Sequence, residues 1–387
     1  MVVVGSGLLL MMAGGTAQAG WLFVLAAGVF ALVVTSFVFP HRLNQVRVSR
    51  EVPRRVRVGD DTPVVLSITN EGRRTIPMLR IEDRLPAFPP VAVASASVPP
   101  TGAVFFEGMR PAYRRGDFDA GDVLVVSGAP FGLGRSRRSL RVEGRVTVVP
   151  RWVDLRSFPL LEPSSSPSDV LHQRARTGAG EEYHGVREYR PGDLKRSVHW
   201  RTSARAGKLV VREFEEHVLT RVAVIVGGSD TGEPPDSAFE SIVSAAASIG
   251  LYALRTGHPI ELFTCASEVE RLSSPADRDL LDRLASVRAG AWDPMEAGTQ
   301  ALRAVHRRGT VVFCATCRGA SMDDLRATIR AVQAAGVRVI VVVARSSTWG
   351  DGVSGQDDAA IDRLRTGRAI VRVLSHGEEL ETCLQGS

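Results

Sequence analysis

The sequence contains few cysteines, few aromatic residues and almost no lysine. Four cysteines in 387 residues exclude a small scaffold held together by disulfides. Aromatic residues make up 6% of the chain and the net charge is +6. Nothing therefore indicates a nucleic-acid-binding protein, which would show a dense basic stripe with stacking aromatics. Lysine occurs only at Lys195 and Lys208, and every other one of the 48 basic residues is arginine.

Charged residues are also absent from Met1 to Pro40. A single helix over this range would measure about 60 Å, roughly twice the hydrocarbon core of a bilayer. The range divides at Thr16–Gly20, so we predict a hairpin of two transmembrane helices over residues 1–40, with Trp21–Phe39 as the stronger span. A signal peptide cleaved at Ala17-Gln18-Ala19 is the alternative, although it would lack the usual basic start.

A group of basic residues follows the apolar range. Because the cytoplasmic flanks of transmembrane helices are rich in arginine and lysine, we expect a multi-pass protein of the plasma membrane with its soluble bulk in the cytoplasm. A domain held there could also contact anionic lipid headgroups. The basic group consists of His41, Arg42, Arg47, Arg50, Arg54, Arg55 and Arg57.

Residues 41–156 show the pattern of short strands. Val64, Leu66 and Ile68 alternate with outward-facing residues, and Asn70-Glu71-Gly72 closes this run as a turn. Several such strands predict a small β-sandwich-like domain. Residues 157–170 are rich in proline and serine, which is typical of a linker.

The pattern changes at residue 221. Val222–Val226 is entirely apolar, and Phe239, Ile242, Val243 and Ala246 begin one face of a helix. Further apolar runs alternate with helical stretches as far as residue 387, so residues 221–387 are predicted to form a Rossmann-type α/β domain. Ligands of such domains bind at the carboxyl ends of the strands.

The segment 171–220 has the densest concentration of charged and aromatic residues, and it contains both lysines. From Arg187 to Arg212 there are eight basic residues and two acidic ones. The segment could be a binding surface with exposed arginines. Alternatively, it could be a structural wedge, with its arginines paired to Glu188, Asp193, Glu213 and Glu215 and with Tyr189 and Trp200 anchored in a core.

This segment closely resembles the signature of family fifty-eight of the domains of unknown function. Tyr113-Arg114-Arg115-Gly116 and Ala129-Pro130-Phe131-Gly132-Leu133 resemble two further elements of that family, although Ala129 replaces an aspartate. The signature is matched at Arg187, Glu188, Tyr189, Pro191, Gly192, Asp193, Arg196, His199, Trp200, Ser203, Ala204, Arg205, Gly207, Arg212, Glu213 and Phe214.

The resemblance implies two amino-terminal spans, a β domain and a von Willebrand A-like domain. It also implies association with MoxR-type AAA+ ATPases in complex assembly or cell-envelope processes, and it implies no established activity. We therefore expect a non-enzymatic, membrane-anchored cytoplasmic scaffold that docks a protein partner and no nucleic acid. The binding residues would be Arg187, Glu188, Tyr189, Gly192, Asp193, Lys195, Arg196, His199, Trp200, Ser203, Arg205 and Arg212.

The alternative is a metal-dependent adhesion module or a hydrolase that uses the strand-end loops. Von Willebrand A-like domains often bind Mg²⁺ through an Asp-x-Ser-x-Ser sequence after the first strand, since hard cations prefer such oxygen ligands. Here Ser229 and Thr231 fit the hydroxyl positions, but Gly227 replaces the leading aspartate and Asp230 is out of register. The site is degenerate, and we expect no cofactor and no Mg²⁺.

Two further groups have residue types suited to chemistry. Cys314-Ala315-Thr316-Cys317 could be a redox pair or, with Cys265 and His306, part of a zinc site, but buried thiols are the simpler interpretation. Ser203, His199 and Asp193 could act as nucleophile, base and orienting acid. No Gly-x-Ser-x-Gly turn surrounds Ser203, so we do not expect an enzyme.

Overall fold

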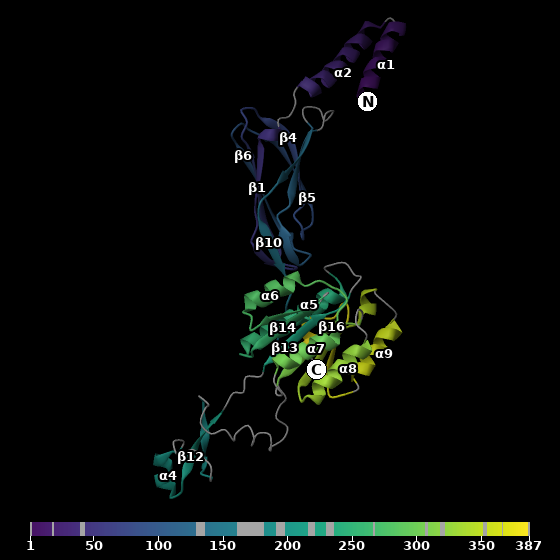
Figure 1. Cartoon of the computed structure of the whole chain (residues 1–387). Helices are drawn as coiled ribbons and strands as arrows, with labels where there is room; N and C mark the ends of the chain where they lie inside the picture. Colours follow the sequence, from purple (N-terminus) through teal and green to yellow (C-terminus); the bar gives the residue numbers. More distant parts are fainter. Residues whose placement is uncertain are drawn as a thin grey trace. The chain divides into compact units, whose positions relative to one another are not determined.

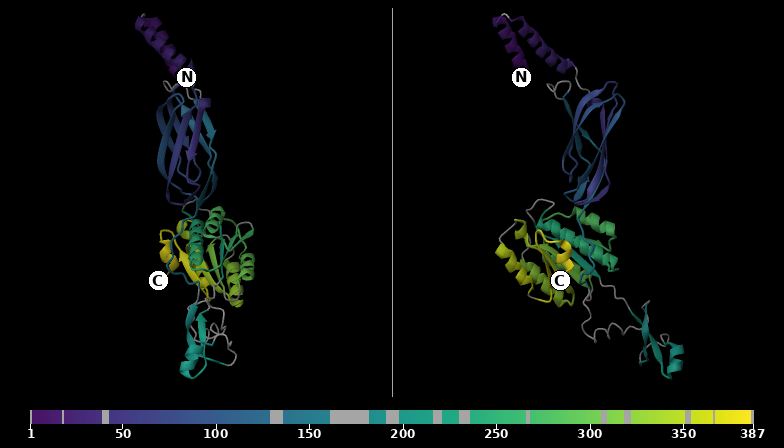
Figure 2. Two further views of the ribbon diagram at one scale, coloured as in Figure 1. Left: turned by 90° about the vertical axis from the view of Figure 1, so that its left-hand side faces the viewer. Right: turned by 180° about the vertical axis from the view of Figure 1, so that it is seen from behind.

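The computed structural model describes most of the chain (Figures 1 and 2). The described residues are 2–17, 19–38, 43–128, 136–160, 182–190, 198–215, 221–229, 236–265, 268–305, 309–317, 322–350, 354–365 and 367–385. Contacts divide the chain into two units. Unit 1 comprises Met1–Arg151, Glu233–Pro235 and Leu281–Val287, and unit 2 comprises Trp152–Gly232, Asp236–Leu280 and Arg288–Ser387.

Two apolar helices begin the chain, α1 (Val2–Ala17) and α2 (Gly20–Val38), and they contact each other. A rise of about 1.5 Å per residue makes them roughly 24 and 29 Å long, short of the ~30 Å hydrocarbon core. No helix in the described ranges has the length and apolar character needed to cross a membrane. The predictions of two transmembrane helices and of a multi-pass membrane protein are therefore wrong.

Unit 1 continues as a strand-rich region of three sheets, with strand orders β1-β3-β6, β2-β10-β7 and β5-β4-β8-β9. The alternation read from Val64, Leu66 and Ile68 is confirmed, because β3 buries every second residue. The short helix η1 is Leu43–Gln45. The strands are β1 (Val46–Glu51), β2 (Arg55–Arg57), β3 (Asp61–Asn70), β4 (Ile76–Asp83), β5 (Val91–Val98), β6 (Ala103–Pro111), β7 (Gly116–Asp119), β8 (Asp122–Ser127), β9 (Ser136–Arg141) and β10 (Arg145–Val149).

Gly116 opens β7 and ends the Tyr113-Arg114-Arg115-Gly116 element. Its φ is +144°, in a region that residues with a side chain rarely adopt. A Cβ atom at this position would lie 2.9 Å from the ring of Phe118. Both facts explain why glycine follows the two arginines. The element from Ala129 to Leu133 lies outside the described residues.

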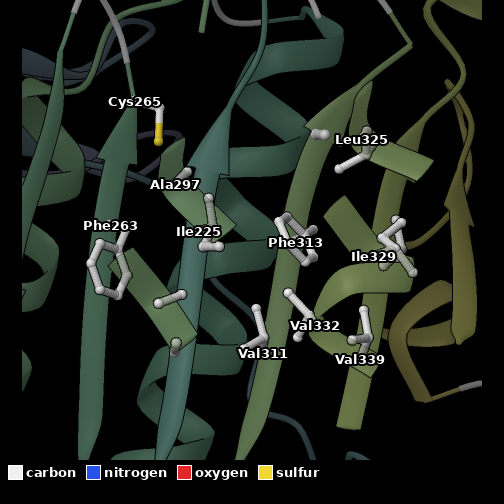
Figure 3. Packing of buried hydrophobic residues seen from close by; sticks show 14 of the residues in the cluster. Ile225, Phe263, Cys265, Ala297, Val311, Phe313, Leu325, Ile329, Val332 and Val339 are labelled. Atoms are coloured by element: carbon white, nitrogen blue, oxygen red, sulfur yellow. The ribbon is translucent and has the colours of Figure 1, made fainter. Parts of the chain in front are cut away.

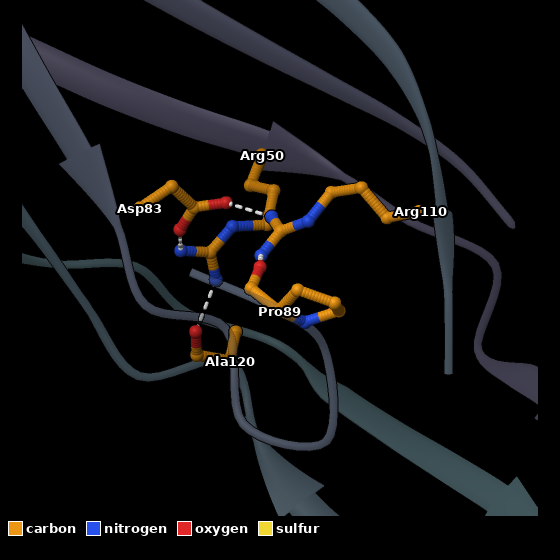
Figure 4. Close-up of polar contacts among 5 residues, drawn as sticks. All are labelled: Arg50, Asp83, Pro89, Arg110 and Ala120. Carbon is orange, nitrogen blue, oxygen red and sulfur yellow. Dashed lines mark hydrogen bonds and ion pairs between the residues drawn. The ribbon is translucent and has the colours of Figure 1, made fainter. Parts of the chain in front are cut away.

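A charged cluster lies inside this strand-rich region (Figure 4). The two carboxylate oxygens of Asp83, at the end of β4, accept separate hydrogen bonds from the guanidinium groups of Arg50 and Arg110. The same arginines also donate to the backbone carbonyl oxygens of Ala120 and Pro89, respectively. All three charged residues are buried, so the carboxylate is the counter-ion for two enclosed cations.

Unit 2 is built around a six-stranded sheet with the order β15-β14-β13-β16-β17-β18. Five strands are parallel, and β15 pairs antiparallel at one edge. The run Val222–Val226 forms part of the fully buried central strand β13. The strands are β13 (Val222–Gly227), β14 (Ile260–Cys265), β15 (Val269–Ser273), β16 (Thr310–Thr316), β17 (Arg338–Ala344) and β18 (Ile370–Leu374).

Helices pack on both faces of this sheet (Figures 1 and 2). Helix α5 contacts β13, β16 and β17, and its buried side chains include the predicted Phe239 and Ile242. Ile225, Phe313 and neighbouring side chains form a cluster with α7 and α8 (Figure 3). The helices are α5 (Ala238–Arg255), α6 (Asp277–Ser286), α7 (Pro294–Ala304), α8 (Met322–Ala334), η3 (Ser346–Trp349), α9 (Ser354–Arg365) and α10 (Leu380–Gln385).

The start of the predicted linker is packed in unit 2. Phe158 is buried and its ring lies edge-on to Tyr252, with 6.5 Å between the ring centres. Leu160 is buried as well, and its carbonyl oxygen accepts a 2.6 Å hydrogen bond from Thr310 Oγ1. These residues are therefore packed in the fold, although the composition of the stretch is typical of a linker. Residues 161–170 lie outside the described part of the chain.

Candidate functional site

The signature segment forms a small structure of two strands and one short helix. The strands β11 (Glu182–Glu188) and β12 (Val210–Glu215) pair antiparallel, and helix α4 (Trp200–Ala206) contacts β12. Val198 forms an additional bridge with Val211. We call residues 182–190 and 198–215 the signature module; Figure 1 shows it in teal, with α4 and β12 labelled.

Helix α4 has defined caps at both ends. His199 is the N-cap; its Nδ1 accepts a 3.2 Å hydrogen bond from the backbone N–H of Thr202 and lies 2.9 Å from the Thr202 hydroxyl. These contacts satisfy a backbone donor that the first helical turn leaves free. Gly207 ends the helix with φ +63°, the left-handed conformation that favours glycine. His199 and Gly207 of the signature thus fix the length of the helix.

Ser203 joins α4 to β12. Its side chain is buried, its hydroxyl lies 3.1 Å from the carbonyl oxygen of His199, and it accepts a 2.9 Å hydrogen bond from the backbone N–H of Val210. These partners are backbone groups, whereas a nucleophile would bond to the ring of its base. The contacts give Ser203 a structural role, and Asp193, the third residue of the hydrolytic alternative, lies outside the described residues.

The opposite face of α4 is exposed. The side chain of Trp200 is 66% exposed, and Arg201, Ala204 and Arg205 are exposed beside it. The interpretation of Trp200 as an anchor in a core is therefore wrong. Among the side chains of the module that the structure describes, those of Val198, Ser203, Val210 and Val211 are buried.

Glu188, one of the acidic residues of the wedge interpretation, forms an ion pair with Lys208. Lys208 Nζ bonds to the carboxylate of Glu188, and both side chains are more than half exposed. The hydrogen bond from Lys208, followed by its charge, lowers the pKa of Glu188. Tyr189 is half-buried, and its backbone N–H donates to the carbonyl oxygen of Leu209 at 2.9 Å.

Several predicted binding residues cannot be placed by side chain. Arg187 lies on β11 and Arg212 on β12, where they pair through the backbone with Val211 and Val186, respectively. Their side chains are outside the described set. The same applies to the whole of Gly192, Asp193, Lys195 and Arg196.

At the carboxyl end of β13, another side chain fills the space that the leading aspartate of a metal site would need. A Cβ atom on Gly227 would lie only 2.5 to 2.8 Å from ring atoms of Trp292. The indole therefore occupies the space of an aspartate side chain. Next to it, the carbonyl oxygen of Ser229 accepts a 2.9 Å hydrogen bond from Thr316 Oγ1, while Asp230 and Thr231 lie outside the described residues.

A pocket of about 200 Å³ lies at the end of the neighbouring strand β14 and includes Trp292 in its lining. Its other lining residues include the carboxylates of Glu268, Asp293 and Glu296 and the thiol of Cys265. Burial, followed by the charges of Glu296 and Asp293, raises the pKa of Cys265 to about 12. Within the described ranges, no three histidine, cysteine or acidic side chains are grouped as a metal ion requires.

The cysteines of the Cys-x-x-Cys sequence lie apart. Cys314 is fully buried, and strand alternation places it on the face of β16 opposite Phe313 and Ala315. Cys317 packs against the cluster that contains Phe313. Burial raises the pKa of both thiols, to about 12 for Cys317. This arrangement supports buried thiols and does not suit a reactive pair.

One group at the sheet edge was not predicted from the sequence. Asp236 accepts a 3.2 Å hydrogen bond from Trp349 Nε1 and lies 2.7 Å from His376 Nε2. The three residues precede α5, end η3 and follow β18. They are far apart in the sequence, so no local pattern could have connected them.

Comparisons with known proteins identify the family of the region that contains the signature, and they indicate no activity. A relative from Bacillus subtilis (strain 168), the uncharacterized protein YeaD, is 24% identical over 383 residues, covering 92% of this chain and 87% of the relative. A CARDB domain from Pyrococcus furiosus is 14% identical over 27% of this chain and 87% of its own, with a TM-score of 0.20. An exo-β-N-acetylglucosaminidase from Vibrio harveyi is 8% identical over 78% of this chain and 57% of its own, also with a TM-score of 0.20.

The family comparison is specific to the region that contains the signature. Residues 185–346 match the family described as protein of unknown function DUF58. This range contains helix α4, strand β12 and the sheet from β13 to β17. The resemblance expected from the signature is therefore confirmed, and the chain carries a DUF58 region over these residues.

Proposed function

We propose that this chain is an interaction protein without catalytic activity of its own, and that the signature module docks a protein partner. The observation that carries the proposal is the exposure of Trp200. A large apolar ring that is 66% exposed on a helix with defined caps contributes nothing to a core in the described structure. Exposed tryptophan and arginine side chains are the residue types most enriched at the energetic centres of protein interfaces.

The build of the module supports the same role. Its core is small, and its caps, strand pairing and Ser203 contacts hold the backbone of α4 in a defined conformation. A preorganised backbone reduces the entropy that binding would otherwise cost. The partner that the family resemblance suggests is a MoxR-type AAA+ ATPase, and complex assembly or cell-envelope work is the corresponding process.

The metal-dependent alternative has less support, because the ring of Trp292 fills the space next to Gly227. The hydrolytic alternative would need Ser203 to exchange its backbone hydrogen bonds for the ring of His199. We therefore take protein docking as the proposed function.

The test is the affinity of the purified full chain for a purified MoxR-type ATPase from the same organism. We expect measurable binding, and Trp200→Ala should weaken it by about thirtyfold, the size of effect shown by central interface residues. Phe105→Ala is the matched control, because Phe105 is 63% exposed on β6 in unit 1. No binding by the wild-type chain, or equal losses in both variants, would refute the proposal.

A further inference from the structure

The exposed side of α4 combines an apolar row with a cationic row. Trp200 and Ala204 are four residues apart, as are Arg201 and Arg205, and such pairs are neighbours on a helix surface. All four side chains are exposed, while Ser203 points to β12. We call Trp200, Arg201, Ala204 and Arg205 the docking face.

The charge of this face is not neutralised by the described structure around it. Neither Arg201 nor Arg205 forms an ion pair with any residue in the described ranges, and the short helix contains no acidic residue. The nearby Glu188 is already bonded to Lys208. Within the described residues, the docking face therefore presents two guanidinium groups without an ion-pair partner beside an exposed indole.

We propose that the docking face binds an acidic segment of a protein partner, in which an apolar side chain packs on Trp200 and carboxylates pair with Arg201 and Arg205. Guanidinium groups form bidentate, charge-assisted hydrogen bonds with carboxylates. Two of them, one helical turn apart, select carboxylates at a similar spacing, and Trp200, in the apolar row beside them, supplies the apolar contact. This inference rests on the proposed docking function and specifies the chemistry of the partner.

A protein segment fits this face better than single-stranded nucleic acid does. Binding of a single strand usually needs several aromatic side chains in succession, so that consecutive bases can stack. Among the module's side chains that the structure describes, the other tyrosine, tryptophan or phenylalanine ring is that of Tyr189, which is half-buried. One exposed ring beside two arginines is sufficient for one apolar side chain with carboxylates next to it.

The first test reverses the charge of the face and measures affinity for the purified ATPase. Arg201→Glu with Arg205→Glu should weaken binding by at least about tenfold at low salt, and the remaining affinity should depend less on salt than that of the wild type. Arg137→Glu with Arg141→Glu is the control. These two arginines are also exposed and four residues apart, but they lie on β9, and their reversal changes the net charge equally.

The second test uses the scarcity of lysine. Lys195 and Lys208 are the only lysines of the chain, and Lys208 lies two residues beyond α4 with a side chain that is 60% exposed. A carbodiimide joins amines to carboxylates that are in direct contact. Coupling of the free chain should join Lys208 to its partner Glu188, and coupling of the complex should give a further peptide in which Lys208 is linked to an aspartate or glutamate of the ATPase. Lys208→Arg keeps the charge and should abolish this peptide without loss of affinity.

The outcomes separate the inference from the function on which it rests. Binding that is weakened by the α4 reversal, spared by the β9 reversal and coupled through Lys208 supports both. Binding that the α4 reversal leaves unchanged refutes the acidic partner segment and leaves the docking function standing. If the wild-type chain does not bind the ATPase at all, the proposed function fails and the inference fails with it.

Discussion

The buried cluster of Arg50, Asp83 and Arg110 gives the sharpest stability prediction. Replacing Asp83 by Asn keeps the shape of the side chain but removes the charge that faces two enclosed guanidinium groups. The side chains of Arg50 and Asp83 are 0% and 5% exposed, so water cannot replace the lost carboxylate. Removing one partner of a buried ion pair costs about 3–5 kcal/mol.

The order of the effects within the cluster follows from its charges. Arg50→Met should cost less than Asp83→Asn, because Arg110 and Asp83 would remain as a neutral pair. It would leave the carbonyl oxygen of Ala120 without its donor, which costs about 1–3 kcal/mol. Glu82→Gln is the matched control on the same strand. Its ion pairs with Arg80 and Arg84 are at the surface and are worth about 0–1 kcal/mol.

Hydrogen–deuterium exchange of peptides from β4 and β8 measures these changes inside the full chain. Exchange reports the opening of these strands in particular, so the change in stability is assigned to unit 1. Each 1.4 kcal/mol is about a tenfold change, so Asp83→Asn should lower protection between roughly a hundredfold and a few thousandfold. If Asp83→Asn loses no more protection than Glu82→Gln, the carboxylate is not the counter-ion that we infer.

Three further predictions concern unit 2. Gly227→Asp should lower the melting temperature, because the new side chain would overlap Trp292, and overpacking costs about 1–3 kcal/mol. Mg²⁺ should not restore the melting temperature of this variant. If the variant had a metal site, Mg²⁺ at a hundred times the Kd would stabilise the fold by about 2.7 kcal/mol, and such a gain would contradict this reasoning. Glu261 is buried on β14, and burial raises the pKa of its carboxyl group. Hydrogen bonds from Arg271, Ser273 and Arg221 and the charge of Arg271 lower the pKa by more than burial raises it, so the net shift is downward. Its stabilising contribution is therefore complete above the unfolded pKa of about 4.3 and is lost as the pH falls through the lower folded pKa. Glu261→Gln should melt below wild type at pH 7, with the difference closing in melts taken toward pH 3, and a constant difference would exclude this role. At pH 8 the thiols of Cys265, Cys314 and Cys317 should stay protonated and resist alkylation until guanidinium unfolds the chain; rapid labelling of folded protein, located by mass spectrometry, would show a reactive thiol.

Local patterns in the sequence predicted the elements whose burial is regular. The alternation around Leu66 identified β3, and the apolar run Val222–Val226 identified β13, because side-chain direction in a strand depends only on position along it. These elements needed no knowledge of distant residues.

The errors arose where the outcome depends on length or on distant contacts. The apolar stretch from Met1 to Pro40 was taken as two spans, but it forms helices too short to cross a membrane. The structural interpretation of the segment placed Trp200 in a core, yet its side chain is exposed. The Asp83 cluster joins three strands, and no spacing in the sequence connects its members.

Gly227 shows how one residue could have indicated more than it did. A glycine at the end of an apolar strand often marks a close approach by another group. The sequence was read only for the aspartate that Gly227 replaces, whereas the structure shows the group that approaches, Trp292. The indole comes from the stretch just before α7, 65 positions later in the chain, so its identity required the fold.

The carboxyl end of β13 and the exposed face of α4, taken together, indicate where this chain would bind a partner. Doubly wound sheets usually bind ligands beyond the carboxyl ends of their central strands. In this chain, Trp292 fills the space beside Gly227, and Thr316 is hydrogen-bonded to Ser229, so the groups at the end of β13 are occupied by contacts within the protein. On the signature module, by contrast, the exposed side chains of Trp200, Arg201 and Arg205 have no partner in the described structure. A side chain without an internal role is free to be selected for an external one, which is why we place binding on α4 and a structural role at the end of β13.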